Sequence, residues 1–249
     1  MSALEKMRDR TRGTQSINTV TAGYFRSNNQ GAAIDGRISD AIRRILIADS
    51  GTELVGKNSD PVFERMESSD AEVLVSAGYD HIIPESTLAA FDRAINLHWS
   101  LLPYGRGENP NIWSITEDHP AGVTIHEMVP DIDSGPIITQ REVSIEPNED
   151  GKNLYLRLID EQVDLFASAW PNIRIGKYET SANPVEGGTY HPRSEFRELC
   201  ELSLDEEMTM GECINILRAL TFEPYENAYF EKDGETYYVE IEISPEQEH

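Results

Sequence analysis

Three polar side chains in the middle of the chain have the types and spacing that acyl chemistry requires. Asn96 and His98 lie two residues apart in the segment INLHWSLLPYGRG. Asp133 lies in an acidic turn of the segment AGVTIHEMVPDIDSGPIITQ. Together they offer an amide donor, an imidazole and a carboxylate. This set suits the transfer of a one-carbon acyl group to an amine.

Each of these groups has a task in such a transfer. When an amine attacks a formyl carbon, the carbonyl oxygen gains negative charge, and preorganised donors at that oxygen change rates by roughly 100- to 1000-fold. Asn96 and His98 can supply N–H donors. Asp133 is the candidate base for the proton that the amine loses, or alternatively it forms an ion pair with His98. No metal is expected.

Apolar runs predict the strands that would position these groups. The runs EVLVSAG (72–78) and AINLH (94–98) are typical of strands buried on both faces of a parallel sheet. Because strand side chains alternate, Asn96 and His98 should point to the same side. They also end their strand, and ligands in open α/β sheets bind beyond the carboxyl ends of strands.

Further elements complete a Rossmann-like α/β fold, with a mostly parallel sheet flanked by helices. VTIHEM and PIITQREVSI predict two more strands, and helices are predicted at 39–48, 60–67, 85–94 and 109–115, the first of which is either a helix throughout or a helix that runs into a strand. Glu85 or Ser86 is expected to cap the third of these helices. A long amphipathic helix is predicted at 153–170, with Pro171 ending it.

The two ends of the chain differ from this central region. Residues 1–36 are polar, and SINTVTAGYF (16–25) is their one candidate strand. We place a domain boundary after Ile175, so that residues 1–175 form the catalytic domain and residues 176–249 a linker and a small C-terminal subdomain. This appendage should contain the helix GECINILRAL and a β-hairpin that turns at Asp233-Gly234.

Composition excludes several classes of partner. The 249 residues carry a formal net charge of −24, which disfavours nucleic acids because their binding depends on Lys and Arg. Two cysteines without metal-like spacing predict neither a disulfide scaffold nor a zinc site. Without a signal-like or membrane-spanning apolar run, a cytoplasmic protein is expected. The acidity also suggests salt adaptation, which predicts stability that rises steeply with molar salt.

Three motifs in order resemble the 10-formyltetrahydrofolate-dependent formyltransferases. They are N-L-H-x-S-L-L-P-x-x-R-G from Asn96, GVTIH from Gly122 and D-S-G-P-I-I from Asp133. The resemblance covers residues 72–145 and implies that Asn96, His98 and Asp133 are the catalytic residues. Relatives usually begin with a strand at the extreme N-terminus, which the polar first residues here do not show. A lost or replaced first strand, or an altered folate-side wall, is therefore expected.

The resemblance also implies a pocket for 10-formyltetrahydrofolate as co-substrate. The residues expected to hold it lie in the loop after the strand at 72–78 and in the loop before Asp133: Gly78, Tyr79, Asp80, His81, Ile82, Ile83, Met128, Val129 and Pro130. The loop after the Asn-His strand supplies the residues expected to meet the acceptor: Ser100, Tyr104, Arg106 and Gly107. His119 and His126 are expected to be core residues, and Trp113 to be structural.

The C-terminal segment from LRALTF to PYENAYF is similar to enzymes that formylate nucleotide-linked amino sugars. A small-molecule amine of that kind is therefore the expected acceptor. Glycinamide ribonucleotide, methionyl-tRNA, simple hydrolysis of the formyl-folate, and a non-catalytic folate- or nucleotide-binding homologue remain as alternatives. Arg218, Phe222 and Tyr225 could contact a nucleotide or a subunit partner, since the aromatic hairpin is a candidate surface for a homodimer.

Overall fold

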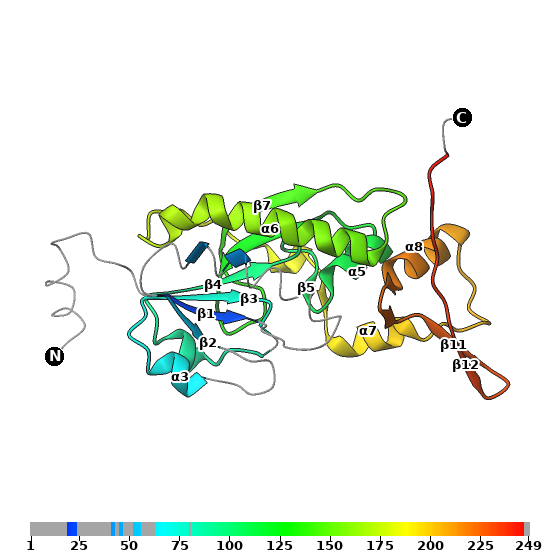
Figure 1. The fold of residues 1–249 in the computed structure, drawn as a ribbon, viewed down its shortest axis with the longest axis horizontal. Helices are drawn as coiled ribbons and strands as arrows, with labels where there is room; N and C mark the ends of the chain where they lie inside the picture. The colour runs from blue at the N-terminus through cyan, green and yellow to red at the C-terminus, as the bar shows by residue number, and fades with distance from the viewer. Residues whose placement is uncertain are drawn as a thin grey trace, which may run out of the picture.

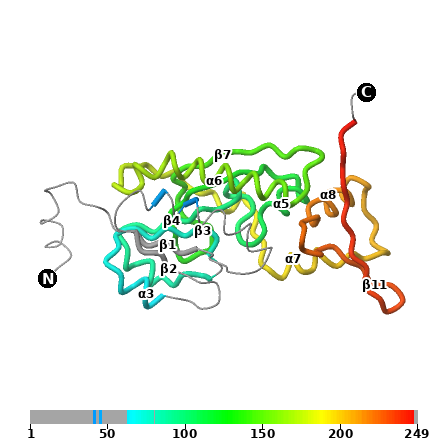
Figure 2. The backbone as a smooth tube through the Cα atoms, in the orientation of Figure 1, coloured from blue at the N-terminus to red at the C-terminus, as the bar shows by residue number. Residues whose placement is uncertain are grey.

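The computed structural model describes residues 19–23, 41–42, 45–46, 52–55, 63–79 and 81–246. The molecule is elongated, with the main sheet and its helices toward one end of the long axis (Figure 1). The C-terminal helices and hairpins lie at the other end, as the orange and red part of the tube in Figure 2 shows.

A six-stranded mixed sheet, in the order β2-β1-β3-β4-β6-β7, forms the centre of the larger part. Its strands are β1 (Thr19–Gly23), β2 (Thr52–Val55), β3 (Val73–Ala77), β4 (Arg93–His98), β6 (Ala121–Glu127) and β7 (Ile137–Val143). Strands β2, β1, β3 and β4 are parallel, whereas β6 and β7 run antiparallel to their neighbours. The four strands predicted between residues 72 and 145 are confirmed, and the expected parallel order holds for four of the six strands of the sheet.

The first strand is present, although it does not lie at the extreme N-terminus. β1 falls within the candidate segment SINTVTAGYF and pairs with β2 on one side and β3 on the other. Its Thr-Val-Thr sequence is typical of a strand because β-branched residues favour extended backbone. The expectation of a lost first strand is therefore wrong.

Helical residues occur in all three segments before the Asn-His strand for which the sequence predicts a helix. In the 39–48 segment, Ala41, Ile42, Ile45 and Leu46 are helical, and the other residues lie outside those described. Helix α3 spans Phe63–Glu67, and α4 spans Glu85–Leu88. The helix predicted to reach residue 94 ends early because the chain enters β4 at Arg93. Pro84 occupies the N-cap without a side-chain bond, so the predicted cap by Glu85 or Ser86 is wrong.

Helix α6 (Gly151–Ile173) lies along one face of the sheet (Figure 1). Asp150 caps it by accepting a hydrogen bond from the backbone N–H of Asn153. One side of this helix faces the core, as its amphipathic pattern predicts: Tyr155, Leu158, Ile159, Gln162 and Phe166 are buried, and Val163 is partly buried. The helix continues past Pro171, contrary to the prediction. Proline lacks only one backbone donor, and Arg174 still donates to the carbonyl of Trp170.

Gln162 is a polar exception in this apolar stripe. It is fully buried, and neither its amide nitrogen nor its amide oxygen has a described hydrogen-bond partner. A buried polar group without a partner costs roughly 1–3 kcal/mol. We therefore expect Gln162→Met, which is similar in length, to raise the free energy of unfolding by about 1 kcal/mol in urea titrations.

Gln140 provides the matched control for this substitution. Its amide nitrogen donates to the carbonyl of Leu102 at 3.1 Å, so Gln140→Met removes a partnered group. This variant should lower the free energy of unfolding. A lower stability in the Gln162→Met variant would contradict the interpretation of Gln162 as an unpaired group.

The segment after α6 pairs with strands of the larger part before the C-terminal elements begin, since Ser181 forms an isolated bridge with Ile137 of β7. It contains the 3-10 turn Val185–Gly187 and strand β8 (Tyr190–His191), which pairs in parallel with β5 (Arg106–Gly107). The predicted helix beside the site is α5 (Pro110–Thr116). The linker expected after Ile175 therefore contains a strand that pairs with the loop after β4.

The predicted C-terminal helix and hairpin are confirmed. Helix α7 (Arg193–Cys200), which no sequence pattern predicted, precedes α8 (Met210–Leu220). Two hairpins follow, β9 (Thr221–Phe222) with β10 (Tyr225–Glu226), and β11 (Tyr229–Lys232) with β12 (Glu235–Tyr238). Asp233 and Gly234 both have positive φ, at 54° and 82°, which is the backbone of a tight two-residue hairpin turn.

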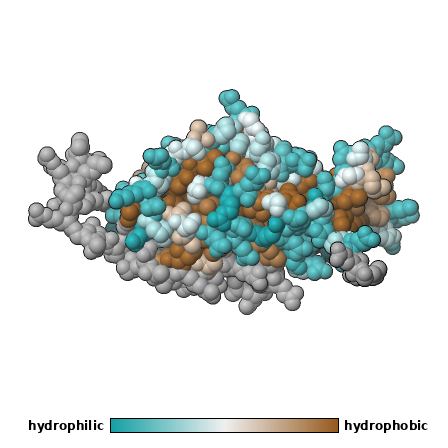
Figure 3. All heavy atoms as spheres, turned by 90° about the horizontal axis from the view of Figure 1, so that it is seen from above, coloured by the Kyte–Doolittle hydropathy of each residue, from teal (hydrophilic) through white to brown (hydrophobic). Residues whose placement is uncertain are grey.

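Apolar side chains are visible on the surface of the C-terminal part (Figure 3). Five large side chains of this part are between 39% and 74% exposed: Met208, Met210, Ile214, Tyr237 and Tyr238.

In the part of the chain that the structure describes, no helix combines the length and apolar character needed to cross a bilayer.

Candidate active site

Four polar side chains meet where β4 and β6 lie side by side. The amide nitrogen of Asn96 lies 3.3 Å from Asp133 Oδ1 and 3.3 Å from His126 Nε2. His98 Nδ1 lies 3.7 Å from Asp133 Oδ2, and His126 Nε2 lies 3.5 Å from Asp133 Oδ1. The carboxylate of Asp133 is thus surrounded by one amide and two imidazoles.

The strand register explains how these groups meet. Asn96 and His98 lie on the same side of β4, as alternation predicts, and both face Asp133. β6 runs antiparallel to β4 with His126 opposite Asn96. Asp133 reaches them from the β6–β7 turn, where it has a left-handed backbone with φ of 48°. The Asn183 amide donates to the carbonyls of Asp133 and Gly135 at 3.0 and 3.2 Å, which fixes this turn.

The hydrogen bonds of the two imidazoles define their proton positions. His98 Nε2 lies 2.9 Å from the carbonyl of Gly105, so this nitrogen donates and Nδ1 faces Asp133. His126 Nδ1 lies 2.8 Å from the carbonyl of Glu127, so in the neutral ring Nε2 is free to accept from Asn96. His98 Nδ1 and His126 Nε2 are therefore the two ring nitrogens that face the carboxylate, at 3.7 and 3.5 Å, and the other nitrogen of each ring contacts a backbone carbonyl.

Asp133 is held as an anion. Its side chain is 11% exposed, and burial by itself raises its pKa. The charge of His98, the hydrogen bond and charge of His126, and the backbone N–H of Gly107 outweigh burial and hold the pKa of Asp133 well below its usual range. A carboxylate in this state binds a proton weakly, so it suits charge stabilisation better than proton abstraction.

The loop after β4 holds both Asp133 and His98 in place. Gly107 N–H donates to Asp133 Oδ2 at 2.9 Å, and the Gly105 carbonyl accepts from His98. This loop is itself fixed by the β8 segment, because Thr189 Oγ1 accepts from the Gly105 N–H at 2.9 Å and β8 pairs with Arg106–Gly107. The His191 ring anchors β8, since it stacks on Trp113 at 4.0 Å.

Gly107 is a position where a side chain should disturb the site. Its φ is +91°, and a Cβ there would lie 2.4 Å from the carbonyl oxygen of His191. We expect Gly107→Ala to displace the N–H that holds Asp133. Because misplacement of a group at a reaction centre by about 1 Å can cost roughly 100-fold in rate, we expect a loss of kcat of about that size for the acyl transfer that the sequence predicts.

Gly234→Ala is the matched control for backbone strain. Gly234 also has positive φ, +82°, but a Cβ added there would have no neighbouring atom within 4 Å, and the residue belongs to the β11–β12 turn. Its substitution should lower stability and leave kcat unchanged. Equal kcat values for the two variants would contradict the positioning role of Gly107.

A cavity of about 670 Å³ contains these groups in its wall. Asn96, His98, His126 and Asp133 all line it. Of the residues expected to hold the folate, the cavity wall includes Gly78, Tyr79, His81, Ile82, Ile83, Met128, Val129 and Pro130, while Asp80 lies outside the described residues. The wall also contains residues from β8, α7 and the β9–β10 hairpin.

The residues expected to meet the acceptor are only partly brought together. Gly107 lines the cavity, whereas Ser100, Tyr104 and Arg106 are absent from its wall. Ser100 is 1% exposed, and Tyr104 packs on His119 with ring centroids 4.9 Å apart. The Arg106 guanidinium lies 5.6 Å from the Tyr190 ring centre. The turn after β4 directs these three side chains into packing contacts, so their acceptor contacts remain predictions.

Sequence reasoning overlooked several residues of this site. It assigned His126 to the core, and it gave no role to Asn183 or His191. His126 is indeed only 2% exposed, yet it also contacts Asn96 and Asp133. The strand register would have identified it, since residues opposite each other on antiparallel strands are neighbours. No local sequence signal marks Asn183, because its partners lie about 50 residues earlier in the chain.

Comparison with protein families gives two matches. Residues 4–170 match the model of the formyl transferase family. Residues 195–245 match the N-formyltransferase dimerization C-terminal domain. The two matches together include every segment of the cavity wall except residues 190–193.

Individual relatives agree with these matches. The dTDP-4-amino-4,6-dideoxyglucose formyltransferase of Mycobacterium tuberculosis is 37% identical over 156 residues, which span 62% of this chain and 66% of the relative. A 4-N formyltransferase from Francisella tularensis has the same fold, with a TM-score of 0.81, 24% identity, and coverage of 93% and 100% of the two chains.

A third relative was solved with ligands. It is the formyltransferase from Anoxybacillus kamchatkensis in complex with UDP-4,6-dideoxy-4-formamido-L-AltNAc and tetrahydrofolate. It is 32% identical with a TM-score of 0.59, over 73% of this chain and 88% of that one.

Proposed function

The chain belongs to the formyl transferase family, and we propose that it transfers a formyl group from 10-formyltetrahydrofolate to the primary amine of a nucleotide-linked amino sugar. The observation that carries this proposal is the meeting of Asn96, His98 and Asp133 in the wall of one cavity. Its volume of about 670 Å³ is within the range of roughly 300–1,000 Å³ that is usual for small-molecule sites.

The hydrogen bonds suggest a division of labour among the three groups. One N–H of Asn96 is directed to Asp133, and the other faces His126. We propose that this second N–H donates to the oxygen that becomes negative in the tetrahedral species. We propose His98 Nδ1 as the acceptor of the amine proton, since Nε2 of this ring donates to the Gly105 carbonyl. When the tetrahedral species collapses, the bond between the formyl carbon and N10 of the folate breaks, and the imidazolium returns the proton to N10, which leaves tetrahydrofolate and the formylated amine.

Asp133 then acts by charge in this proposal. The pKa of its carboxyl lies well below the usual range. Asp133 is therefore too weak a base to take the proton of the amine, which is the first of the two roles predicted from the sequence. An anion 3.7 Å from Nδ1 stabilises the imidazolium that His98 becomes when it accepts the proton. Of the two roles expected for Asp133, pairing with His98 is therefore the one we favour.

The loops at residues 78–83 and 128–130 suit a flat conjugated co-substrate. Ile82 and Val129 are 68% and 37% exposed on the cavity wall, and an aromatic ring can cover such apolar surface. When bound, 10-formyltetrahydrofolate supplies the formyl carbon that the amine attacks. We propose that these loops bind it, on the support of their location beside Asn96.

A nucleotide-linked amino sugar is the acceptor best supported by the relatives. One curated relative is named for a dTDP-linked amino sugar, and a solved one holds a UDP-linked formamido sugar. The net charge of −24 works against methionyl-tRNA, because a polyanion is repelled by an acidic surface.

We also propose a cytoplasmic location and, on the match of residues 195–245, a homodimer. The division between residues 1–175 and 176–249 remains part of this proposal.

The proposal is tested by incubating the protein with formyl-folate and a panel of UDP- and dTDP-linked amino sugars. A mass increase of one formyl group on one acceptor is the expected result. The panel includes glycinamide ribonucleotide, and free formate is measured in parallel. Formylation of glycinamide ribonucleotide alone, or release of formate without any formylated amine, would refute the proposal.

The homodimer is tested separately. Light scattering gives the mass of the protein in solution, and a monomer would refute the homodimer.

A further inference from the structure

Four aromatic rings form a continuous wall of the cavity. Trp99 contacts Tyr155 with ring centroids 5.3 Å apart, Tyr155 contacts Phe222 at 5.5 Å, and Phe222 contacts Tyr225 at 5.7 Å. All four rings line the cavity. We call this set the aromatic wall. It begins next to His98 and is built from the loop after β4, from α6 and from the β9–β10 hairpin.

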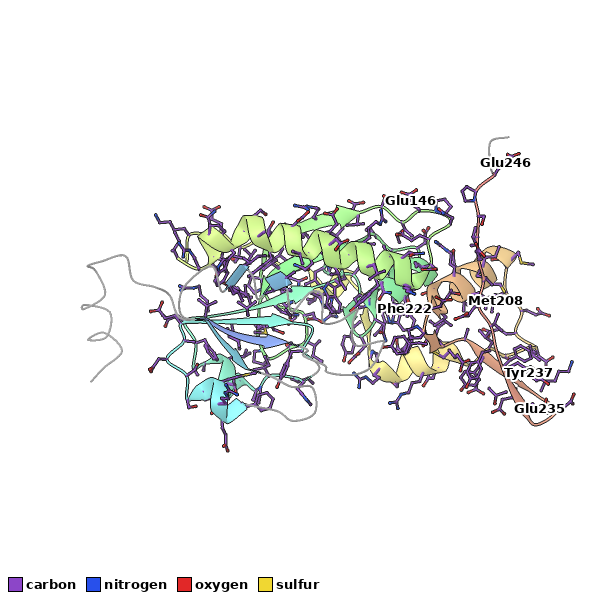
Figure 4. The ribbon with its side chains drawn as sticks, viewed as in Figure 1. Glu146, Met208, Phe222, Glu235, Tyr237 and Glu246 are labelled. Carbon is purple, nitrogen blue, oxygen red and sulfur yellow. The ribbon has the colours of Figure 1, made fainter. Side chains whose placement is uncertain are left out.

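The aromatic wall opens toward the solvent at its C-terminal end. Tyr155 is 7% exposed and Phe222 is partly buried, whereas Tyr225 is 42% exposed. Phe222 lies where the C-terminal part meets the end of α6 and α5 (Figure 4). Ring faces at the open end are thus accessible to a ligand whose reacting group lies deeper, beside His98.

One cation lines the cavity near this end. Among the described residues, Arg193 is the one arginine or lysine in the cavity wall. Its guanidinium is 3.0 Å from Glu108 Oε1, and both side chains are well exposed. Exposed ion pairs of this kind are weak, so a phosphate can replace the carboxylate as partner of the guanidinium.

We propose that Tyr225 and Phe222 stack on the base of a nucleotide-linked acceptor and that Arg193 contacts its phosphates. This inference rests on the proposed function and specifies which residues recognise the nucleotide. An aromatic side chain stacks well on a nucleotide base, because every base is planar and has a π face. In a chain with a net charge of −24, a cation beside this surface offsets the repulsion of phosphate.

The aromatic wall is a better match for the nucleotide than for the folate. The loops proposed for the folate, at residues 78–83 and 128–130, come from the ends of β3 and β6. Phe222, Tyr225 and Arg193 come from the C-terminal part instead. With the transferred formyl group beside Asn96 and His98, the acceptor must approach from a different part of the cavity than the folate.

The test is calorimetric titration of the full-length protein with uridine and thymidine diphosphates, the corresponding nucleosides, and 5-formyltetrahydrofolate. Tyr225→Ala should weaken binding of the diphosphates and nucleosides by about 5- to 150-fold, the range for loss of one stacked base. Tyr225→Phe should bind nearly as the wild type does. Arg193→Gln should weaken the diphosphates and leave the nucleosides unchanged. Folate binding should be the same in every variant.

Tyr237→Ala is the matched control. Tyr237 is 43% exposed, close to the value for Tyr225, and it belongs to the β11–β12 hairpin away from Phe222 (Figure 4). It is not part of the cavity wall. Its substitution should leave nucleotide binding unchanged. Equal losses in the Tyr225→Ala and Tyr237→Ala variants would overturn the inference, because a disturbed C-terminal part would then explain both.

The outcomes separate this inference from the proposed function. Undiminished nucleotide binding in Tyr225→Ala, or a loss of folate binding instead, refutes the stacking site while formyl transfer to a nucleotide-linked amine still stands. Absence of nucleotide binding by the wild type refutes the stacking site as well. Formyl transfer is measured separately with the wild type, so its failure identifies an error in the proposed reaction.

Discussion

Asp133→Asn is expected to lower kcat by about 100- to 10,000-fold, the range for loss of a group that assists proton transfer. The substitution keeps the shape of the side chain and removes its charge. Gly107 N–H can still donate to an amide oxygen, whereas the imidazolium of His98 loses the anion 3.7 Å away. The measurement is the initial rate of formyl transfer at saturating co-substrate, with circular dichroism to verify the fold.

Asp118→Asn is the matched control, because Asp118 also has a left-handed backbone, with φ of 55°, but is exposed and lies outside the cavity wall. It should retain the wild-type rate. A rate for Asp133→Asn within a few-fold of the wild type would refute the role of the charge.

The same substitution should change the response of stability to acid. The folded-state pKa of Asp133 lies below the unfolded value of about 3.9. Its ionisation therefore stabilises the fold above that unfolded value, and this contribution is lost as the pH falls toward the folded pKa. The Asn variant lacks this contribution, so the free energy of unfolding should fall less between pH 5 and pH 3 than it does in the wild type. An unchanged acid profile would contradict the pKa assignment.

His98→Gln is expected to lower kcat by a similar factor, about 100- to 10,000-fold, for a different reason. Gln can place its amide nitrogen near the position of Nε2 and still donate to the Gly105 carbonyl. It offers no basic nitrogen at the position of Nδ1. Folate affinity should change little, so the loss should appear in kcat rather than in KM for the co-substrate.

His119→Gln controls for the general effect of losing an imidazole. His119 pairs with Glu117 and packs on Tyr104 outside the cavity wall. Its variant should transfer formyl at the wild-type rate. Turnover of His98→Gln equal to that of His119→Gln would leave His98 without a role in proton transfer.

Much of the fold follows from local sequence patterns. The apolar runs at residues 72–78 and 94–98 predict β3 and β4, and the helical stripe predicts α6. These predictions succeed because apolar residues repeat about every two residues along a strand and every 3.6 residues along a helix, and such spacing can be read from residues that are close in the chain. Two of the predictions that failed concern element ends. α4 stops early and α6 passes Pro171 because pairing and packing with distant residues decided those boundaries.

The sequence by itself determined that Asn96 and His98 share one side of a strand end, since alternation along a strand requires it. It also identified Asp133 through a motif, without its distance to the other two groups. Only the tertiary structure decided that His126 lies opposite Asn96, that Gly107 holds Asp133, and that Asn183 fixes the turn. These contacts depend on an antiparallel register and on chain segments that are remote in sequence. A local pattern carries no information on which remote segments pair, because that choice is made by the packing of the whole core.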